Sequence, residues 1–298
     1  MKPKSNKELI WDNVIGKIKF VGNEDFHLYE FESGKRQASV TTKNIMEKPF
    51  LYDYSAKVAF EYLEREGFSS IKPSNRNIYL ANAIEARKVI LRDSSDNVGT
   101  PAHEAIESYT LEWIKTGKLP SDITHFIEKK TIFDEELKEY KDVTDPRVYA
   151  SARSAEKWLR KMEDKITPLF AEIRVGDDRY SAGTIDFVFE FKDSGDLYIL
   201  DWKTSNQMND DYALQASAYA KFLEHMIGRK VGAFIAHLSK EKDSYEIYEV
   251  KNIAKNYTAF KSMCKLYDWK YGKFDKLVRD ITIYDTTGKT NSKRVRKC

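Results

Sequence analysis

The sequence has little cysteine, glycine and proline. Its 298 residues include 2 Cys, 13 Gly and 7 Pro. Two cysteines, Cys264 and Cys298, are too few for a disulfide framework or a four-cysteine metal site, so we expect a reducing compartment. The low glycine and proline content excludes a collagen-like or low-complexity chain.

Long apolar runs are also missing. No segment approaches the roughly 18 consecutive apolar residues that a membrane-spanning helix needs. Residues 1–7 lead into mixed sequence without the apolar centre of a signal peptide. We therefore expect a cytoplasmic protein that has no membrane partner.

The composition is that of a folded globular protein. Hydrophobic residues make up 41% and charged residues 33% of the chain. A chain of this length forms one large or two ordinary domains. The formal net charge is only +3, but residues 221–298 contain 18 Lys and Arg against 9 Asp and Glu. This basic region is either a solvated lysine-rich face or a surface that binds phosphate groups.

Hydrophobic periodicity predicts an α+β fold. Alternation over residues 11–21 and 26–32 predicts an N-terminal β-hairpin, and helical spacing predicts helices over 41–66 and 78–91. Thr100 as N-cap and Pro101 as first residue predict the start of a further helix. The remaining expected elements are strands over 170–175, 183–191, 197–203, 231–238 and 245–250, and helices over 146–165, 211–227 and 254–269.

These elements predict a central mixed β-sheet flanked by helices. We divide the chain into an N-terminal β-hairpin and helical elaboration (1–95), a core (96–270) and a basic C-terminal tail (271–298), which together form one compact unit. No internal repeat or clear linker separates them.

Two carboxylates and a lysine stand in otherwise apolar strands. Asp201 and Lys203 are two residues apart, so their side chains project from the same face of a strand. The turn over 192–196 suits an antiparallel hairpin that brings Asp186 close to Asp201. Converging carboxylates repel each other unless a cation lies between them. The pattern therefore predicts a site for a hard divalent cation such as Mg²⁺.

The chemistry of Lys203 stays open at this point. It could position or deprotonate an attacking water, or stabilise charge on a phosphate. The simpler alternative is a buried Asp–Lys pair without any catalytic role.

Four motifs follow one another along the chain: Gly-Thr-Pro-Ala-His-Glu at 99–104, Gly-Thr-Ile-Asp at 183–186, Asp-Trp-Lys at 201–203 and Gln-Ala-Ser-Ala-Tyr at 215–219. In this order they resemble the PD-(D/E)xK nuclease superfamily, specifically its RecB-like exonuclease branch. This branch includes phage exonucleases and the mitochondrial genome maintenance exonuclease. Gln215 and Tyr219 are four residues apart, on one face of a helix.

The resemblance implies a restriction-endonuclease-like core and a role for each matching residue. It implies that the metal is bound by His103, Asp186, Asp201 and the backbone carbonyl of Trp202, that Lys203 is the catalytic lysine, and that Gln215, Tyr219, Thr204 and Ser205 contact DNA. Glu172, Glu104 and Glu107 are either ligands of a second metal or structural partners of other side chains.

The sequence also departs from the superfamily pattern. Ile185 stands where the proline of the superfamily name would be, and Asp201 replaces the commoner glutamate. The four cysteines that bind an iron-sulfur cluster in some relatives are missing, so we expect no such cluster.

The expected function is a Mg²⁺- or Mn²⁺-dependent DNA exonuclease, phage-encoded, that takes part in recombination, repair or genome processing. Its substrate would be DNA with a free end or single-stranded DNA, and its location the cytoplasm, that of the host if the protein is phage-encoded. One alternative is a structure-selective or single-strand endonuclease on the same fold. The other is a catalytically inactive DNA-binding scaffold, although every catalytic position of the motifs is filled.

Overall fold

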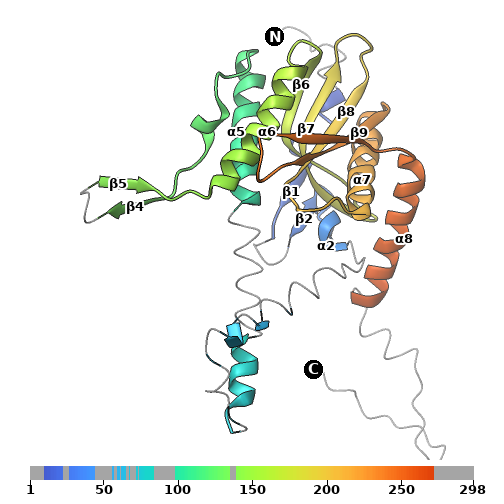
Figure 1. Cartoon of the computed structure of the whole chain (residues 1–298). Helices are drawn as coiled ribbons and strands as arrows, with labels where there is room; N and C mark the ends of the chain where they lie inside the picture. Colours follow the sequence, from blue (N-terminus) through green and yellow to red (C-terminus); the bar gives the residue numbers. More distant parts are fainter. Residues whose placement is uncertain are drawn as a thin grey trace, which may run out of the picture.

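A five-stranded mixed sheet forms the centre of the protein (Figure 1). The computed structural model describes residues 10–22, 27–43, 98–134 and 139–271, together with 56, 59–60, 62–64, 67, 72 and 74–83. The sheet has the order β10-β9-β8-β7-β6, with β8 and β9 parallel and the other pairs antiparallel. Its strands are β6 (Ile166–Asp177), β7 (Ser181–Phe191), β8 (Leu197–Lys203), β9 (Val231–Leu238) and β10 (Tyr245–Glu249).

Helices cover both faces of this sheet. On one face lie α5 (Gly99–Thr116) and α6 (Pro146–Met162), and on the other α7 (Asp210–Ile227) and α8 (Ile253–Tyr271) (Figure 1). The expected α+β fold with a mixed sheet flanked by helices is therefore confirmed.

Alternation along β8 explains why both faces are covered. Leu200 and Trp202 pack with α5 and α6, whereas Leu197 and Ile199 pack with α7. Trp202 is fully buried, and its ring meets that of Trp158 edge-to-face at 5.7 Å. The polar residues at the end of β8 therefore continue a strand that is buried on both sides.

Helix α5 begins two residues earlier than expected. Val98, not Thr100, is the N-cap, and it provides no side-chain hydrogen bond to the helix. The helix ends at Gly117, which adopts a left-handed conformation and donates its N–H to the carbonyl of Trp113 over 2.8 Å.

The N-terminal hairpin belongs to a second, three-stranded sheet. Its strands are β1 (Ile18–Phe20), β2 (Leu28–Phe31) and β3 (Arg36–Ala38), followed by the short helix α2 (Val40–Lys43). The antiparallel pairing of β1 with β2 confirms the expected hairpin. The expected strand over 11–21 is wrong at its beginning, because residues 10–11 are helical and only Ile18–Phe20 pairs.

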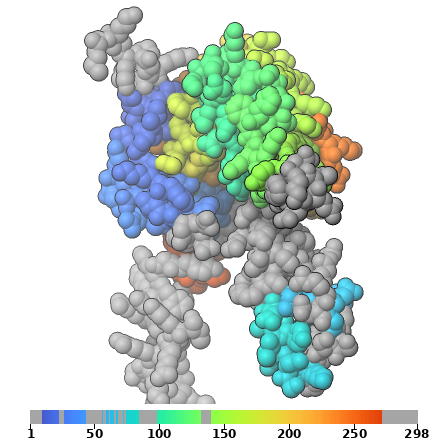
Figure 2. All heavy atoms as spheres, turned by 90° about the vertical axis from the view of Figure 1, so that its left-hand side faces the viewer, coloured from blue at the N-terminus to red at the C-terminus, as the bar shows by residue number. Residues whose placement is uncertain are grey.

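This small sheet is fastened to the turn between β6 and β7. The Ser181 hydroxyl donates to the carbonyl of Ala38 over 2.7 Å, and the Gln37 amide donates to the carbonyl of Asp178 over 2.7 Å. Figure 2 shows the blue N-terminal residues against the yellow part of the core. The N-terminal elaboration thus contributes to the same end of the sheet as the start of β7.

Between α5 and α6 the chain forms features that we did not expect. After η2 (Ile123–Phe126), β4 (Thr131–Asp134) and β5 (Glu139–Asp142) pair as a ribbon that extends away from the body (Figure 1). No helix among the described residues is long and apolar enough to cross a membrane.

Some expected elements fall partly or wholly outside the described residues. Of the helices expected over 41–66 and 78–91, residues 41–43, 56, 59–60, 62–64 and 78–83 are helical, and most of the remainder lies outside the described residues. The basic tail also lies outside, apart from residue 271. The proposed boundaries near residues 95 and 270 stay predictions.

Candidate active site

Three acidic residues occupy one row across three neighbouring strands. The pairing of β6 with β7 puts Glu172 level with Asp186. The pairing of β7 with β8 ends at Phe187 and Leu200. One step further along the same register, Asp186 comes level with Asp201. The sheet itself therefore gathers the carboxylates that the sequence predicts to converge.

The ladder between β7 and β8 is replaced here by a side-chain contact. The backbone N–H of Trp202 donates to Oδ2 of Asp186 over 2.7 Å. A carboxylate thus takes the place of a backbone acceptor beyond the last paired residues of the two strands. This bond fixes Asp186 beside the segment that carries Asp201 and Lys203.

Asp201 and Lys203 form a buried ion pair. Nζ of Lys203 lies 2.5 Å from Oδ2 of Asp201, and the two side chains are 16% and 2% exposed. Their side chains therefore share one face, as the spacing of two residues predicts. The Lys203 ammonium also lies 5.0 Å from the centre of the Tyr212 ring, on α7.

Helix α5 brings an imidazole to the carboxylates. Nδ1 of His103 lies 3.8 Å from Oδ2 of Asp186. Ala102, Ile106 and Trp113 belong to the buried side of α5, which packs against the sheet and fixes the rotation of the helix about its axis. His103 thus lies next to Asp186 although more than 80 residues separate the two in sequence.

The protonation equilibria reflect an excess of buried carboxylates. Burial raises the pKa of Asp186 and of Asp201 to about 6, and the Lys203 ammonium opposes this rise in both. Burial and the charges of Asp186, Glu107 and Asp201 raise the pKa of Glu172 to about 8. The site therefore holds more negative groups than its single ammonium can balance.

The pKa values of Lys203 and His103 are shifted by the same surroundings. Burial alone would lower the pKa of Lys203, but the Asp201 and Asp186 carboxylates outweigh it and raise that pKa. Burial and the Lys203 ammonium lower the pKa of His103 to about 4. At neutral pH Lys203 is charged, whereas His103 is a neutral imidazole, the form that binds metals.

The three glutamates whose role the sequence left open, Glu172, Glu107 and Glu104, occupy different places. Glu172 is half-buried and adopts a φ of 50°, a left-handed conformation that is unusual for glutamate. Glu107 is half-buried one turn after His103, and burial and the Glu104 carboxylate raise its pKa. Glu104 is exposed. Glu172 thus belongs to the carboxylate row, Glu107 adds negative charge beside it, and Glu104 lies further out.

The donor set fits a hard divalent cation in its chemistry. No group of three His, Cys, Asp or Glu side chains within the described ranges is arranged to hold a metal ion as it stands. However, Oδ2 of Asp201 is buried and has no hydrogen-bond partner of good geometry within the same ranges. Its near neighbour is the Lys203 ammonium, with which it forms an ion pair. Buried carboxylates with raised pKa values and a neutral imidazole are the ligands that such an ion would use.

Helix α7 carries the expected glutamine and tyrosine on one face. The side-chain amide of Gln215 donates to the Tyr219 hydroxyl over 3.2 Å. Tyr219 is only 4% exposed, and burial together with the Asp201 carboxylate raises its pKa well above the usual value. The pair therefore lies beside the carboxylates, with Gln215 the more accessible member.

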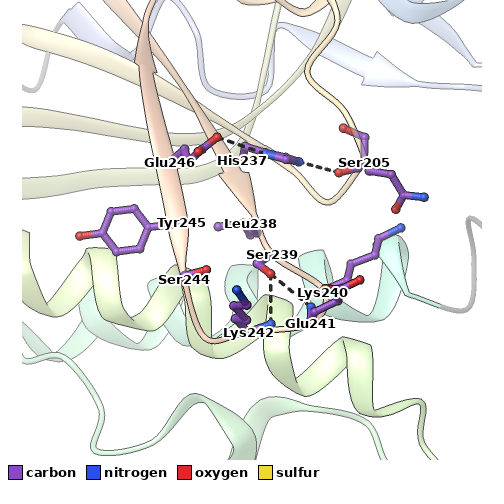
Figure 3. Close-up of a pocket in the computed structure, with 11 residues that line it drawn as sticks. Ser205, His237, Leu238, Ser239, Lys240, Glu241, Lys242, Ser244, Tyr245 and Glu246 are labelled. Carbon is purple, nitrogen blue, oxygen red and sulfur yellow. Dashed lines mark hydrogen bonds and ion pairs between the residues drawn. The ribbon is translucent and has the colours of Figure 1, made fainter.

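The residues after Lys203 are held by β9. Nε2 of His237 lies 2.6 Å from the carbonyl oxygen of Ser205, and Nδ1 of His237 lies 3.7 Å from Glu246 (Figure 3). The Ser205 hydroxyl donates to the carbonyl of Gln207 over 2.7 Å. Thr204 is buried beneath the first turn of α5. The segment expected to contact DNA is therefore anchored at the edge of the sheet.

One residue near the site was not found from the sequence. The Tyr29 hydroxyl, on β2, lies 3.1 Å from the hydroxyl of Thr184, two residues before Asp186. The two tyrosine and threonine positions are 155 residues apart, and an isolated tyrosine in a short strand carries no motif that points to such a contact.

A known protein family matches more than half of the chain. The family described as the PD-(D/E)XK nuclease superfamily matches residues 79–280. Among solved structures, the chain is similar to a provisionally named exonuclease from Eubacterium rectale, with 15% identity and a TM-score of 0.32, over 62% of this chain and 76% of the other. No curated protein sequence matches.

Proposed function

This chain belongs to the PD-(D/E)XK nuclease superfamily, and from that premise we propose that it is a metal-dependent deoxyribonuclease of the RecB-like exonuclease branch. The row of Asp186 and Asp201, with Lys203 and His103 at its edge, is the observation that carries this proposal. It offers ligands for a cation and a separate ammonium for the phosphate.

Each proposed metal ligand has a suitable protonation state. Asp186, Asp201 and His103 would hold Mg²⁺ or Mn²⁺, and we add the Trp202 carbonyl as a further ligand. When bound, such an ion activates water and polarises a phosphoryl oxygen. A divalent charge beside these carboxylates would favour their ionised forms, which burial disfavours.

Lys203 would stabilise negative charge that develops on the phosphate. Its pKa is raised, so the ammonium is present at neutral pH and acts as a donor rather than a base in this state. Its ion pair with Asp201 holds the amine at the edge of the ligand set. Gln215 and Tyr219, linked by a hydrogen bond, would position the DNA strand beside it. The proposed products are a 5′-phosphate and a free 3′-hydroxyl.

Digestion of end-labelled linear and closed circular DNA tests this function. With Mg²⁺ or Mn²⁺ we expect loss of the linear DNA alone, and with EDTA no cleavage. Cleavage of the circle would establish an endonuclease on this fold. Binding of both forms without cleavage would establish an inactive scaffold, and the absence of binding and cleavage would refute the proposal.

A further inference from the structure

The first turn of α5 lies directly above the residue that follows Lys203. Gly99 is the first residue of the helix, and a Cβ atom at this position would lie 3.4 Å from the hydroxyl oxygen of Thr204. The Thr204 side chain therefore points at the start of the helix. Because Gly99 has no side chain, the space between the two stays open.

The start of α5 has unsatisfied donors. Its N-cap, Val98, provides no side-chain hydrogen bond, and the amides of the first turn have no partner within the helix. Pro101 has no N–H, which leaves the amides of Gly99 and Thr100 as the donors at this end. An 18-residue helix also presents partial positive charge at its N-terminus, where phosphate groups commonly bind.

The Thr204 hydroxyl provides a second, independent indication of a ligand. Thr204 is 9% exposed, and within the described ranges its hydroxyl makes no hydrogen bond. Its oxygen is not among the described side-chain atoms that are fully buried without a partner, so a ligand can reach it. A negatively charged oxygen between Thr204 and the helix start would satisfy the hydroxyl and the amides together.

The backbone around Thr204 is fixed from the other side. His237 is the register partner of Lys203 on β9, and its ring contacts the carbonyl of Ser205 (Figure 3). The hydroxyl of Thr204 is therefore held between two anchored neighbours. A rigid donor of this kind loses little entropy when it binds a ligand.

The hollow next to this site is a weaker candidate. It has a volume of about 380 Å³ and begins at Ser205. Its charged lining consists of Lys240, Lys242, Glu241 and Glu246, which balance one another (Figure 3). The helix start with Thr204, by contrast, directly adjoins the catalytic lysine.

We propose that the amides of Gly99 and Thr100, with the hydroxyl of Thr204, bind an internal phosphodiester group of the substrate strand next to the scissile phosphate. The site lies about one helical turn, ~5 Å, before His103, which suits a neighbouring phosphate of the same strand. This inference rests on the proposed nuclease function and adds a phosphate-binding site to it.

Binding of a single-stranded oligonucleotide, measured by fluorescence anisotropy in EDTA, tests the site without cleavage. Thr204→Val, which keeps the shape but removes the hydroxyl, weakens binding about tenfold. Thr204→Ser, which keeps the hydroxyl, stays within about twofold of wild type. Thr258→Val is the matched control on α8, where the hydroxyl donates to a carbonyl of its own helix, and leaves binding unchanged.

Gly99→Ala separates ligand binding from folding. The added methyl group fills the space beside Thr204, so we expect binding to weaken about tenfold. Thermal stability stays equal or rises, because alanine favours a helix over glycine. If Thr204→Val and Gly99→Ala both bind like wild type while the wild type cleaves DNA, this inference fails and the proposed function stands. If the wild type neither binds nor cleaves DNA, both fail.

Neutral linkages locate the phosphate along the strand. Each oligonucleotide of a set carries one uncharged methylphosphonate, placed at successive positions along the strand. We expect the wild type to bind about tenfold more weakly only when this linkage occupies one particular position. In Thr204→Val this position no longer matters. Oligonucleotides with and without a 5′-phosphate distinguish an internal group from a terminal one. An equal loss at every position in both proteins would overturn the assignment.

Discussion

The ring of Tyr219 packs directly on the α-carbon of Gly183. A Cβ atom at position 183 would lie 2.5 Å from Cε1 and 2.8 Å from the hydroxyl oxygen of Tyr219. This contact joins α7 to β7 three residues before Asp186. It gives a physical reason for the glycine that opens the motif at 183–186, since any other side chain would separate the helix from the strand.

Gly183→Ala should therefore destabilise the protein. Overpacking of this kind typically lowers the free energy of unfolding by about 1–3 kcal/mol, which corresponds to several degrees in melting temperature. Thermal unfolding of Gly183→Ala, Tyr219→Ala and the double variant measures the coupling between them. The alanine at 183 should be nearly harmless when the ring is absent, and an equal loss in both backgrounds would contradict the contact.

The metal-free protein should lose stability as the pH rises from about 5 to 8. The folded-state pKa of Glu172, about 8, is higher than its usual value of 4.5, so in this interval the folded state binds more protons than the unfolded state. Stability then falls with rising pH, by about 1 kcal/mol per pH unit for such a group. Asp186 and Asp201 shift in the same direction over a narrower interval.

Denaturant unfolding in EDTA at several pH values measures this dependence. Glu172→Gln removes the titrating group and should flatten the slope relative to wild type, since all other groups remain. Addition of Mn²⁺ at pH 8 should raise the melting temperature of the wild type, and less so that of Asp186→Asn. A slope that is the same in wild type and Glu172→Gln would show that Glu172 does not ionise with a raised pKa.

The centre of the fold was predictable because its signals are local. The strand expected over 197–203 has these bounds in the structure, and the turn over 192–196 sets the register of β7 and β8. Asp186 and Asp201 come together because a hairpin joins neighbouring strands. The likeness to a known family added His103, whose position depends on how α5 packs.

Contacts between distant segments were not predictable in this way. The ribbon of β4 and β5 lies in a charged stretch that lacks clear alternation. Tyr29 reaches Thr184 only because β3 is bound to the turn after β6. The left-handed conformation of Glu172 was not predictable either, because the residues next to it in the sequence do not require it. It depends on the place of Glu172 in the sheet.

The buried lysine of α2 yields an asymmetric prediction. Lys43 is 1% exposed, and its ammonium contacts Asp268 at 2.8 Å and Gln37 at 2.9 Å. Asp268→Ala leaves a buried charge whose partners among the described residues, the Gln37 amide and the Tyr267 ring, are neutral, so we expect a loss of about 3 kcal/mol. Lys43→Met removes that charge and leaves the half-exposed Asp268 to water, so the loss should stay below about 1.5 kcal/mol.

Denaturant unfolding of the two variants measures this difference. Lys265→Ala, at an exposed position of α8, serves as the control and should change stability by less than about 0.5 kcal/mol. Equal losses in Lys43→Met and Asp268→Ala would show that packing, rather than the unpaired charge, determines the effect.

Replacement of Lys203 or Asp201 should abolish cleavage without abolishing binding. Lys203→Met and Asp201→Asn each remove charge that the reaction needs, so kcat should fall at least 100-fold. Because the pair is buried, either change should also lower stability, by up to about 3 kcal/mol, so assays belong well below the melting temperature. Lys192→Ala, at the exposed turn before β8, is the matched control and should retain full activity. DNA binding in EDTA should stay within a few-fold of wild type in all three variants. Activity that persists in clean preparations of both active-site variants would remove Asp201 and Lys203 from the mechanism.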